Sequence, residues 1–220
     1  MKVLYEDNHV LAVVKPVNVP VQGDDSKDED MLSLCKAYLK EKYNKPGNVF
    51  VGLVHRLDRP VGGCMVFAKT SKGAARLSEA VRTHKLEKEY VAVLDGIPKE
   101  KEGTLEDYLI KDSRTNMVHT TKDKTKGKYA RLHYKVIAEK DGRALVHILL
   151  DTGRPHQIRV QFASRGTPLL FDQRYNPHAT KGQIALWAAR LTFPQPVTKE
   201  PITITDLPAG GHWHGFEVQL

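Results

Sequence analysis

The feature that most limits how this chain can fold is a series of short apolar segments, each bounded by turn residues. Residues 10–14 (VLAVV) are followed by Lys15 and Pro16, and residues 90–94 (YVAVL) are followed by Asp95 and Gly96. Apolar runs of about four to eight residues between turn signals are typical of buried β-strands. The strands expected on this basis cover residues 3–6, 10–14, 63–69, 90–94, 129–138, 144–150, 184–193 and 202–205.

Helical signals are fewer. Because strands outnumber helices and short turns join several of them, we expect an α+β fold with a mainly antiparallel mixed sheet flanked by helices and loops. No linker rich in Pro, Gly or Ser divides residues 1–220, so a single domain is expected. The expected helices cover residues 31–43, 71–83 with Ser71 as N-cap, and 155–164 with Pro155 in the first turn and Gly166 at the end.

The chain is basic, with 34 Lys and Arg against 26 Asp and Glu and a formal net charge of +8. Cationic surface favours polyanion partners, because it releases counterions from nucleic acid; a solvated surface without a partner is the alternative. Residues 22–30 are acidic and predict an exposed loop, and residues 111–128 predict an exposed basic loop or hairpin. The basic segment holds Lys111, Arg114, Lys122, Lys124, Lys126 and Lys128.

Cysteine usage and the N-terminus indicate a cytoplasmic protein. Cys35 and Cys64 are far apart and flanked by apolar residues, so we expect two buried free thiols and no metal site. The N-terminus becomes charged too early for a signal peptide, and no apolar run approaches the length that crosses a membrane.

The first candidate site is the segment HRLDRPVGG, residues 55–63, which places Asp58 between Arg56 and Arg59 just before a buried strand. Turn-rich segments beside rigid strands often carry catalytic groups, and nearby guanidinium groups keep a carboxylate ionised. An ordinary structural ion pair at a strand end is the alternative.

Two further segments carry candidate residues. Residues 153–159 (GRPHQIR) place cationic side chains at a helix start, which suits phosphate groups, although a solvated basic face would have the same composition. Residues 88–96 (KEYVAVLDG) place Tyr90 at the start of an apolar strand, where an aromatic residue alone is more often part of the core.

Taken together and in this order, the segments resemble the RluA-type family of RNA pseudouridine synthases. The likeness covers almost the whole chain. The sequence departs from the family pattern at Val14, at Val61 and Gly62, and at Phe171, where the family has Asn, Thr-Ser and Gly. The matching residues are Glu6, Asp7, Leu11, Val13, Lys15 and Pro16; His55, Arg56, Leu57, Asp58 and Gly63; Ala68 and Lys69; Lys88, Tyr90, Ala92 and Gly96; Gly153, Arg154, His156, Gln157, Ile158 and Arg159; and Gly166, Pro168, Leu169, Asp172 and Tyr175.

The resemblance implies an isomerase that converts uridine to pseudouridine in an active-site cleft across the sheet. Product and substrate have the same atoms, so no cofactor or metal is expected. Asp58 is the essential carboxylate, acting on the sugar carbon as in glycoside hydrolysis, on the base, or through a glycal. Tyr90 stacks on the target base and helps to remove the C5 proton, and Arg159 pairs with Asp58.

The same resemblance implies an RNA-binding role for a second group of residues. Arg56 fills the gap that the flipped nucleotide leaves, and His55 is a neighbouring support. Arg154, His156 and Gln157 are further candidates for RNA contact. We expect the partner to be a structured stem-loop of ribosomal or transfer RNA, and the protein to be a monomer that starts in the catalytic domain without an S4-like domain.

Two rival functions remain open at this point. One is an RNA-binding protein on the same fold that has lost catalysis, against which intact Asp58, Tyr90 and Arg159 argue. The other is a hydrolase that cleaves a nucleoside, which would need a second carboxylate to activate water. Only Asp151 is near by motif, and it more readily supports the helix start.

Overall fold

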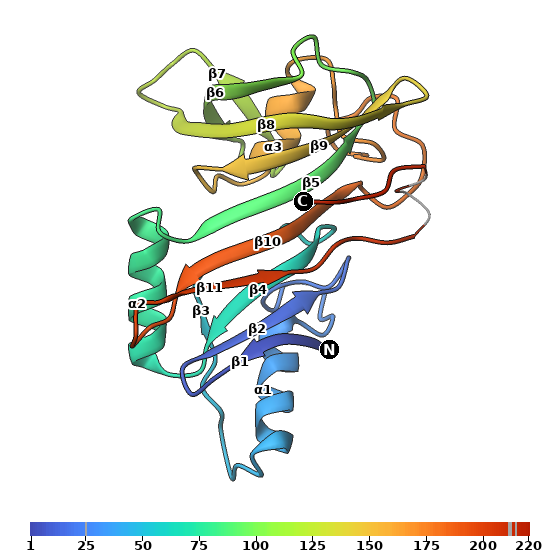
Figure 1. The fold of residues 1–220 in the computed structure, drawn as a ribbon. Helices are drawn as coiled ribbons and strands as arrows, with labels where there is room; N and C mark the ends of the chain where they lie inside the picture. Colours follow the sequence, from blue (N-terminus) through green and yellow to red (C-terminus); the bar gives the residue numbers. More distant parts are fainter. Residues whose placement is uncertain (25, 211–212, 214) are drawn as a thin grey trace. The chain divides into compact units, whose positions relative to one another are not determined.

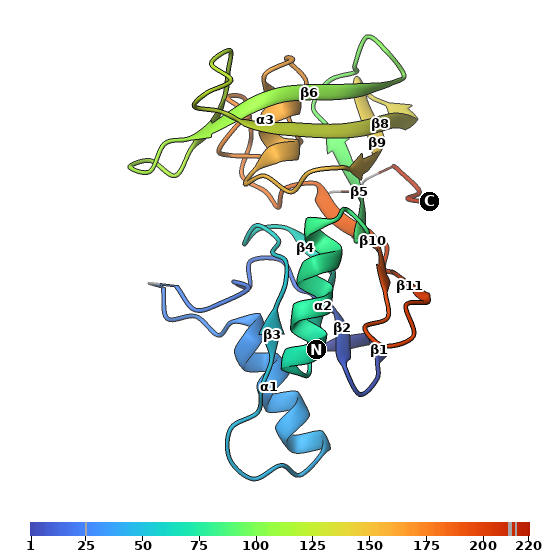
Figure 2. The same cartoon turned by 90° about the vertical axis from the view of Figure 1, so that its left-hand side faces the viewer.

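The computed structural model describes residues 1–24, 26–210, 213 and 215–220, and these form two compact units. Each unit has its own set of strands and its own helices (Figures 1 and 2). The first unit contains Met1–Glu87 and Ala188–Asp206, and the second contains Lys88–Trp187 and Leu207–Leu220.

The sheet of the first unit is centred on two buried strands, β2 and β4. They pair antiparallel, every residue of β4 is buried, and so are nearly all residues of β2. Such continuous apolar strands must be covered on both faces. The strand order is β1-β2-β4-β10, with β3 beside β4 and β11 beside β10. The elements are β1 (Lys2–Glu6), β2 (Val10–Lys15), α1 (Met31–Lys42), β3 (Gly52–Leu53), β4 (Gly62–Ala68), α2 (Ser71–Arg82), β10 (Leu186–Pro194) and β11 (Pro201–Thr205).

Helix α2 packs on this sheet through a buried apolar cluster that contains Leu77 and Ala80 of the helix. The predicted cap was one residue late: Thr70, not Ser71, is the N-cap, and its hydroxyl accepts a hydrogen bond from the Gly73 backbone N–H at 3.0 Å. Helix α1 begins at Met31, as predicted.

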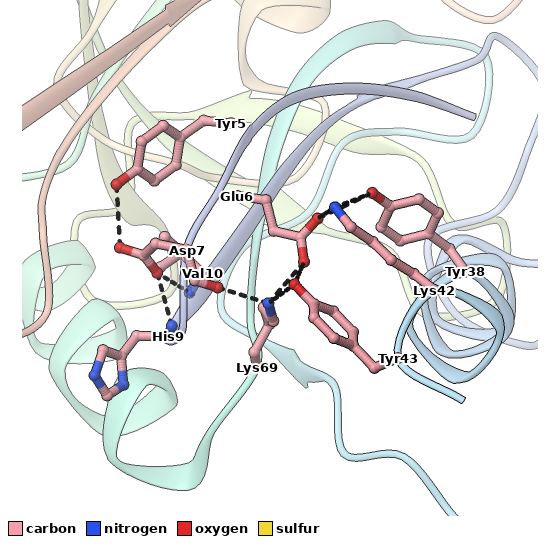
Figure 3. A network of polar contacts seen from close by, with 9 residues as sticks. All are labelled: Tyr5, Glu6, Asp7, His9, Val10, Tyr38, Lys42, Tyr43 and Lys69. Atoms are coloured by element: carbon pink, nitrogen blue, oxygen red, sulfur yellow. Dashed lines mark hydrogen bonds and ion pairs between the residues drawn. The ribbon is translucent and has the colours of Figure 1, made fainter. Parts of the chain in front are cut away.

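Helix α1 is fastened to the sheet by hydrogen bonds that converge on Glu6, at the end of β1 (Figure 3). Tyr38 donates to the carboxylate at 2.9 Å, Lys42 at 2.7 Å and Tyr43 at 2.6 Å. Lys69, which directly follows β4, donates at 2.7 Å. Burial on its own raises the pKa of Glu6, but these donors together lower it to about 2, so the carboxylate is ionised at neutral pH.

The second unit holds a five-stranded sheet in the order β5-β9-β8-β6-β7, with antiparallel pairing throughout. Strands β8 and β9 form the predicted hairpin, in which Asp141 and Gly142 have φ angles of 51° and 73°. The elements are β5 (Glu87–Leu94), β6 (Glu102–Lys111), β7 (Val118–Thr121), β8 (Lys128–Lys140), β9 (Arg143–Leu150) and α3 (Gln157–Ala163).

Helix α3 packs on one face of this second sheet. Its Val160 lies in a buried cluster with Leu109, Val118 and Ala130, and Phe162 contacts Tyr134 edge-on with ring centroids 5.4 Å apart. The helix begins two residues later than predicted. Strand β6 was not predicted, although the exposed hairpin expected next to it is present as the β6–β7 pair and the loop before β8.

The expected α+β fold with a mainly antiparallel sheet is confirmed in both units. Both cysteines are free and buried, and burial raises the pKa of each thiol to about 12. Among the helices of the described residues, none is long and apolar enough to cross a membrane.

Replacing Glu6 with Gln should lower the free energy of unfolding at pH 7 by about 1–3 kcal/mol, because a neutral amide is a weaker acceptor for two ammonium groups. Since the folded-state pKa of Glu6 lies below its ordinary value, the wild type should lose this advantage as the pH falls from about 4.5 to about 2. Urea unfolding of both proteins over this range measures the difference; a constant difference would contradict the assignment to Glu6.

Candidate active site

The Asp58 segment is held in place by a buried lysine at the end of β2. Lys15 is fully buried, and its Nζ donates to three backbone carbonyls: those of Pro16 at 2.9 Å, Arg59 at 2.9 Å and Val61 at 2.8 Å. The Val61 backbone N–H in turn donates to the Asp58 carbonyl at 2.9 Å. The backbone from Asp58 to Val61 is therefore fixed.

The charge of Lys15 also interacts with charged side chains of this segment. Burial is the main effect on the pKa of Lys15, and it lowers that pKa. The Asp58 carboxylate raises the pKa and the Arg59 guanidinium lowers it, and the result is a pKa of about 8. An ammonium group has three N–H donors, and the three carbonyls match them, whereas a neutral amine would leave one carbonyl without a donor. The geometry thus selects the cationic form of Lys15, close to the Asp58 carboxylate.

Gly63 ends the segment at a point where no side chain fits. Its φ is 120°, and a Cβ built there would lie 2.2 Å from the Ala188 carbonyl oxygen of β10. Glycine is needed for both reasons, the backbone angle and the close approach of the neighbouring strand.

The polar side chains around Asp58 have partners within the first unit. His55 is largely buried, and its Nε2 accepts a hydrogen bond from the Val66 backbone N–H at 3.1 Å, which ties the segment to β4. Arg56 is exposed and donates to the side-chain oxygen of Gln22. The sequence suggested both residues for RNA contact; the structure shows His55 bonded to β4, the strand that follows this segment.

Arg59 is bound by the acidic segment 22–28. Its guanidinium forms ion pairs with Asp24 at 3.3 Å and with Asp28, and it donates to Ser26 at 3.0 Å. All of these side chains are at least two-fifths exposed or lie on an exposed loop, so salt screens the pairs. The acidic loop predicted from composition therefore neutralises an arginine next to Asp58.

In the second unit, Arg159 is locked in a buried ion pair with Asp172. The Arg159 Nε and Nη2 donate to the two carboxylate oxygens at 2.8 and 2.7 Å, and both residues are almost completely buried. The guanidinium also lies over the Tyr175 ring, 5.2 Å from its centroid. Sequence reasoning missed this pairing, although the late motif contains both Asp172 and Tyr175.

Phe171 precedes Asp172 with a φ of 61°, in the left-handed region that glycine adopts most easily. The family pattern has Gly here, and Gly adopts this conformation without strain. The Phe171 ring lies against Gly182, where a built Cβ would approach it to 2.7 Å. A glycine at position 182 therefore makes room for the aromatic ring at position 171.

The turn before α3 is held by Gln157, which is 3% exposed. Its Oε1 accepts from the Thr152 hydroxyl at 2.8 Å and from the Arg154 backbone N–H at 3.0 Å, and its Nε2 donates to the Arg131 carbonyl at 3.0 Å. His156 has a φ of 53°, which delays the helix start to Gln157. Gln157 is thus a support of the turn.

Three more predicted residues lie in the same unit. The His156 Nδ1 is 2.7 Å from the Tyr175 hydroxyl, and burial raises the pKa of that hydroxyl. The Arg154 Nε donates to the Tyr129 carbonyl at 2.8 Å. Tyr90 is 6% exposed on β5, where it pairs in register with Ile148 of β9. Tyr90, His156 and Arg159 therefore all belong to the second unit, and Asp58 to the first.

Among the described residues, no group of three or more His, Cys, Asp or Glu side chains is placed to hold a metal ion. Asp151, the second carboxylate considered for a hydrolase, contacts Arg131 at 3.3 Å and the His133 ring at 3.0 Å. It is thus part of a polar cluster with side chains of β8.

Comparisons with known proteins agree on one family. The family model described as RNA pseudouridylate synthase matches residues 9–164. An uncharacterized RNA pseudouridine synthase of Zymomonas mobilis is 32% identical over 209 residues, covering 92% of this chain and 91% of the relative. The ribosomal large subunit pseudouridine synthase C of Buchnera aphidicola is 31% identical over 174 residues. That match covers 79% of this chain and 54% of the relative, so this chain spans about half the length of that protein.

A solved structure has the same fold. The human RNA pseudouridylate synthase domain containing 4 protein superposes with a TM-score of 0.80 at 21% identity, covering 94% of this chain and 88% of that chain. At this level of identity, the likeness concerns the fold.

Replacing Lys15 with Met should lower the free energy of unfolding by about 2–4 kcal/mol, because three backbone carbonyls lose the buried ammonium that donates to them. Denaturant unfolding measures the loss. The matched control is Lys72→Met, an exposed lysine on α2 with the same change in charge, which should cost well under 1 kcal/mol. Equal effects of the two substitutions would contradict the anchoring role of Lys15.

Replacing Asp172 with Asn should cost about 3–5 kcal/mol, because it removes the buried carboxylate charge that accepts from two nitrogens of the Arg159 guanidinium. The control is Glu79→Gln, which breaks an exposed ion pair with Arg82 and should change stability by less than about 1 kcal/mol. Thermal unfolding compares the two. A small loss in Asp172→Asn would show that the pair does not hold Arg159 in place.

Proposed function

We propose that Asp58 carries the reaction in this chain, which belongs to the RNA pseudouridylate synthase family and is an isomerase that converts uridine to pseudouridine in RNA. The reaction breaks the N1–C1′ bond of the nucleotide, turns the uracil and forms a C5–C1′ bond. One proton leaves C5 and one is added at N1, so the atoms balance without a co-reactant. The carboxylate attacks or stabilises the electron-poor centre that forms when the first bond breaks.

The observation that best supports this role is the anchoring of the Asp58 segment by Lys15. A catalytic carboxylate must be held within a fraction of an ångström of its productive position. Two hydrogen bonds from this ammonium to the Arg59 and Val61 carbonyls, and a third to the Pro16 carbonyl at the end of β2, supply that rigidity. The Asp58 carboxylate in turn raises the pKa of the buried Lys15, so the two groups attract each other.

Arg159 and Tyr90 complete the proposed catalytic group. Arg159 orients Asp58 and keeps it ionised during the reaction, and its fixed position on Asp172 supports this role, because a guanidinium held on two nitrogens is already oriented. Tyr90 stacks on the target uracil and assists removal of the C5 proton. It is the first buried residue of β5, which supports a positioning role.

The RNA-contacting group is proposed to be Arg56, Arg154 and His156, with His55 and Gln157 supporting the backbone beneath them. Arg56 enters the base stack when the target nucleotide is flipped out, and it must first leave Gln22. The His55 ring accepts from the Val66 backbone N–H, and the Gln157 amide bonds to the Arg154 backbone N–H and the Arg131 carbonyl, which supports a structural role for both.

We further propose that the substrate is a structured stem-loop of ribosomal or transfer RNA, and that the protein acts in the cytoplasm as a monomer and as a single catalytic domain of residues 1–220. The name of the Buchnera relative refers to the large ribosomal subunit, which favours ribosomal RNA as the first substrate to examine. Pseudouridine maps of total RNA from cells with and without this protein would identify the modified uridine.

Replacing Asp58 with Asn should lower the rate of isomerisation by about a hundredfold or more while leaving RNA binding largely unchanged. Tritium release from C5-labelled uridine in RNA measures the reaction, and filter binding measures affinity. The matched control is Asp24→Asn, an exposed carboxylate on the same unit, which should keep its activity. Full activity of Asp58→Asn would overturn the assignment.

A further inference from the structure

Lys88 stands apart from the other buried cations of this chain. It lies on β5 two residues before Tyr90, so the two side chains point to the same side of the strand, about 7 Å apart along it. Lys88 is only partly exposed, while Tyr90 beside it is buried. Any ligand that contacts Tyr90 on this side is therefore within reach of the Lys88 ammonium group.

The Lys88 ammonium lies against the backbone of Gly153, in the turn between β9 and α3. A Cβ built on Gly153 would be 3.0 Å from the Lys88 Nζ, which is closer than ordinary van der Waals contact. A side chain at position 153 would therefore push the ammonium away. No positive φ requires glycine there, so the close approach of Lys88 is the feature that favours it.

Among the described residues, the Lys88 ammonium has no hydrogen-bond acceptor and no ion-pair partner. Burial alone lowers its pKa, with no carboxylate acting in the opposite direction. Lys69 has a different environment, since it donates to Glu6, to the Asp7 carbonyl and to the Tyr43 hydroxyl. A partly buried cation without a counter-charge is unfavourable unless a ligand supplies one.

We propose that Lys88 binds a backbone phosphate of the target nucleotide, in a subsite formed by the Lys88 ammonium and the Gly153 turn. This inference rests on the proposed function, because RNA supplies the anion. The phosphodiester is the anionic group that RNA carries at each nucleotide, and lysine binds it as a point charge. A base on Tyr90 and a phosphate on Lys88 would be two parts of one nucleotide, separated by two residues of strand.

The subsite predicts a loss of affinity rather than of chemistry. Lys88→Met should weaken binding of the smallest RNA hairpin that the wild type modifies by about tenfold or more, as expected for a charge-assisted hydrogen bond. The single-turnover rate at saturating hairpin should stay within about twofold of the wild type. Lys72→Met is the control for loss of one positive charge, and it should bind normally.

Gly153→Ala tests the same subsite without removing the lysine. Its Cβ would displace the ammonium, so the variant should also weaken binding, and the double variant Lys88→Met, Gly153→Ala should bind no more weakly than Lys88→Met alone. Additive losses would show that Gly153 acts independently of Lys88, which would overturn the subsite.

The decisive measurement changes the RNA instead of the protein. Hairpins with one uncharged methylphosphonate at each position next to the target uridine should include one that binds the wild type about tenfold less tightly, and that penalty should vanish in Lys88→Met. The inference is overturned if no such position exists, or if the penalty persists in Lys88→Met. It is also overturned if Lys88→Met binds normally but reacts slowly, which would assign Lys88 to proton transfer.

These outcomes are distinct from failure of the proposed function. If the wild-type protein releases no tritium from any cellular RNA, the isomerase assignment fails before the subsite is tested. If the wild type is active and the methylphosphonate penalty is the same in both proteins, only the subsite fails.

Discussion

The first unit depends on one buried charge, the ammonium of Lys15. It joins the end of β2 to the segment that precedes β4, because its three N–H groups donate to carbonyls of both. Placing a lysine in an apolar sheet is costly, and the cost is offset only if all three N–H groups find acceptors. The same arrangement that makes the charge tolerable also fixes the backbone at Asp58. The same hydrogen bonds therefore stabilise the β2–β4 strand pair and position the Asp58 carboxylate.

The second unit uses a buried charge pair in a comparable way. Arg159 lies on the short helix α3, and Asp172 lies beyond the helix in a turn that the left-handed Phe171 makes possible. The Asp172 side chain also accepts from the backbone N–H of Arg174 at 3.1 Å, so the carboxylate organises its own turn while it holds the arginine. A guanidinium fixed in this way cannot follow its substrate, which suits a group that must be in position before the reaction begins.

The strands at the centre of each unit were predictable because their signal is local. Residues 10–14 and 90–94 are apolar without interruption, and only a buried strand accommodates so short a run. The start of α3 was not predictable, because Gln157 is held by the Thr152 hydroxyl and by the Arg131 carbonyl of a distant strand. Such contacts leave no periodicity in the sequence.

In the candidate site too, some features could be predicted from local sequence and others depend on contacts between distant residues. The motifs identified Asp58, Tyr90 and Arg159 as candidate catalytic residues. The side chains that each of them contacts depend on the fold. Asp172 is an example: the sequence contained it in a motif, yet its bond to Arg159 follows only from the path of the chain after α3. The left-handed backbone at Phe171 is not indicated by the residue itself, and only the glycine of the family pattern at this position points to a positive φ.

The net charge of +8 says how many cations this chain has in excess, but not which of them RNA can use. Arg59 is already paired with Asp24 and Asp28, so a phosphate must compete with carboxylates of the same chain to reach it. Lys15 and Lys69 are enclosed by acceptors and are removed from that competition altogether. A cation that has no such acceptor gains the full charge-assisted bond when a phosphate arrives, because nothing has to be broken first. We therefore expect affinity for RNA to depend less on the total charge than on which cations have no carboxylate partner within the protein.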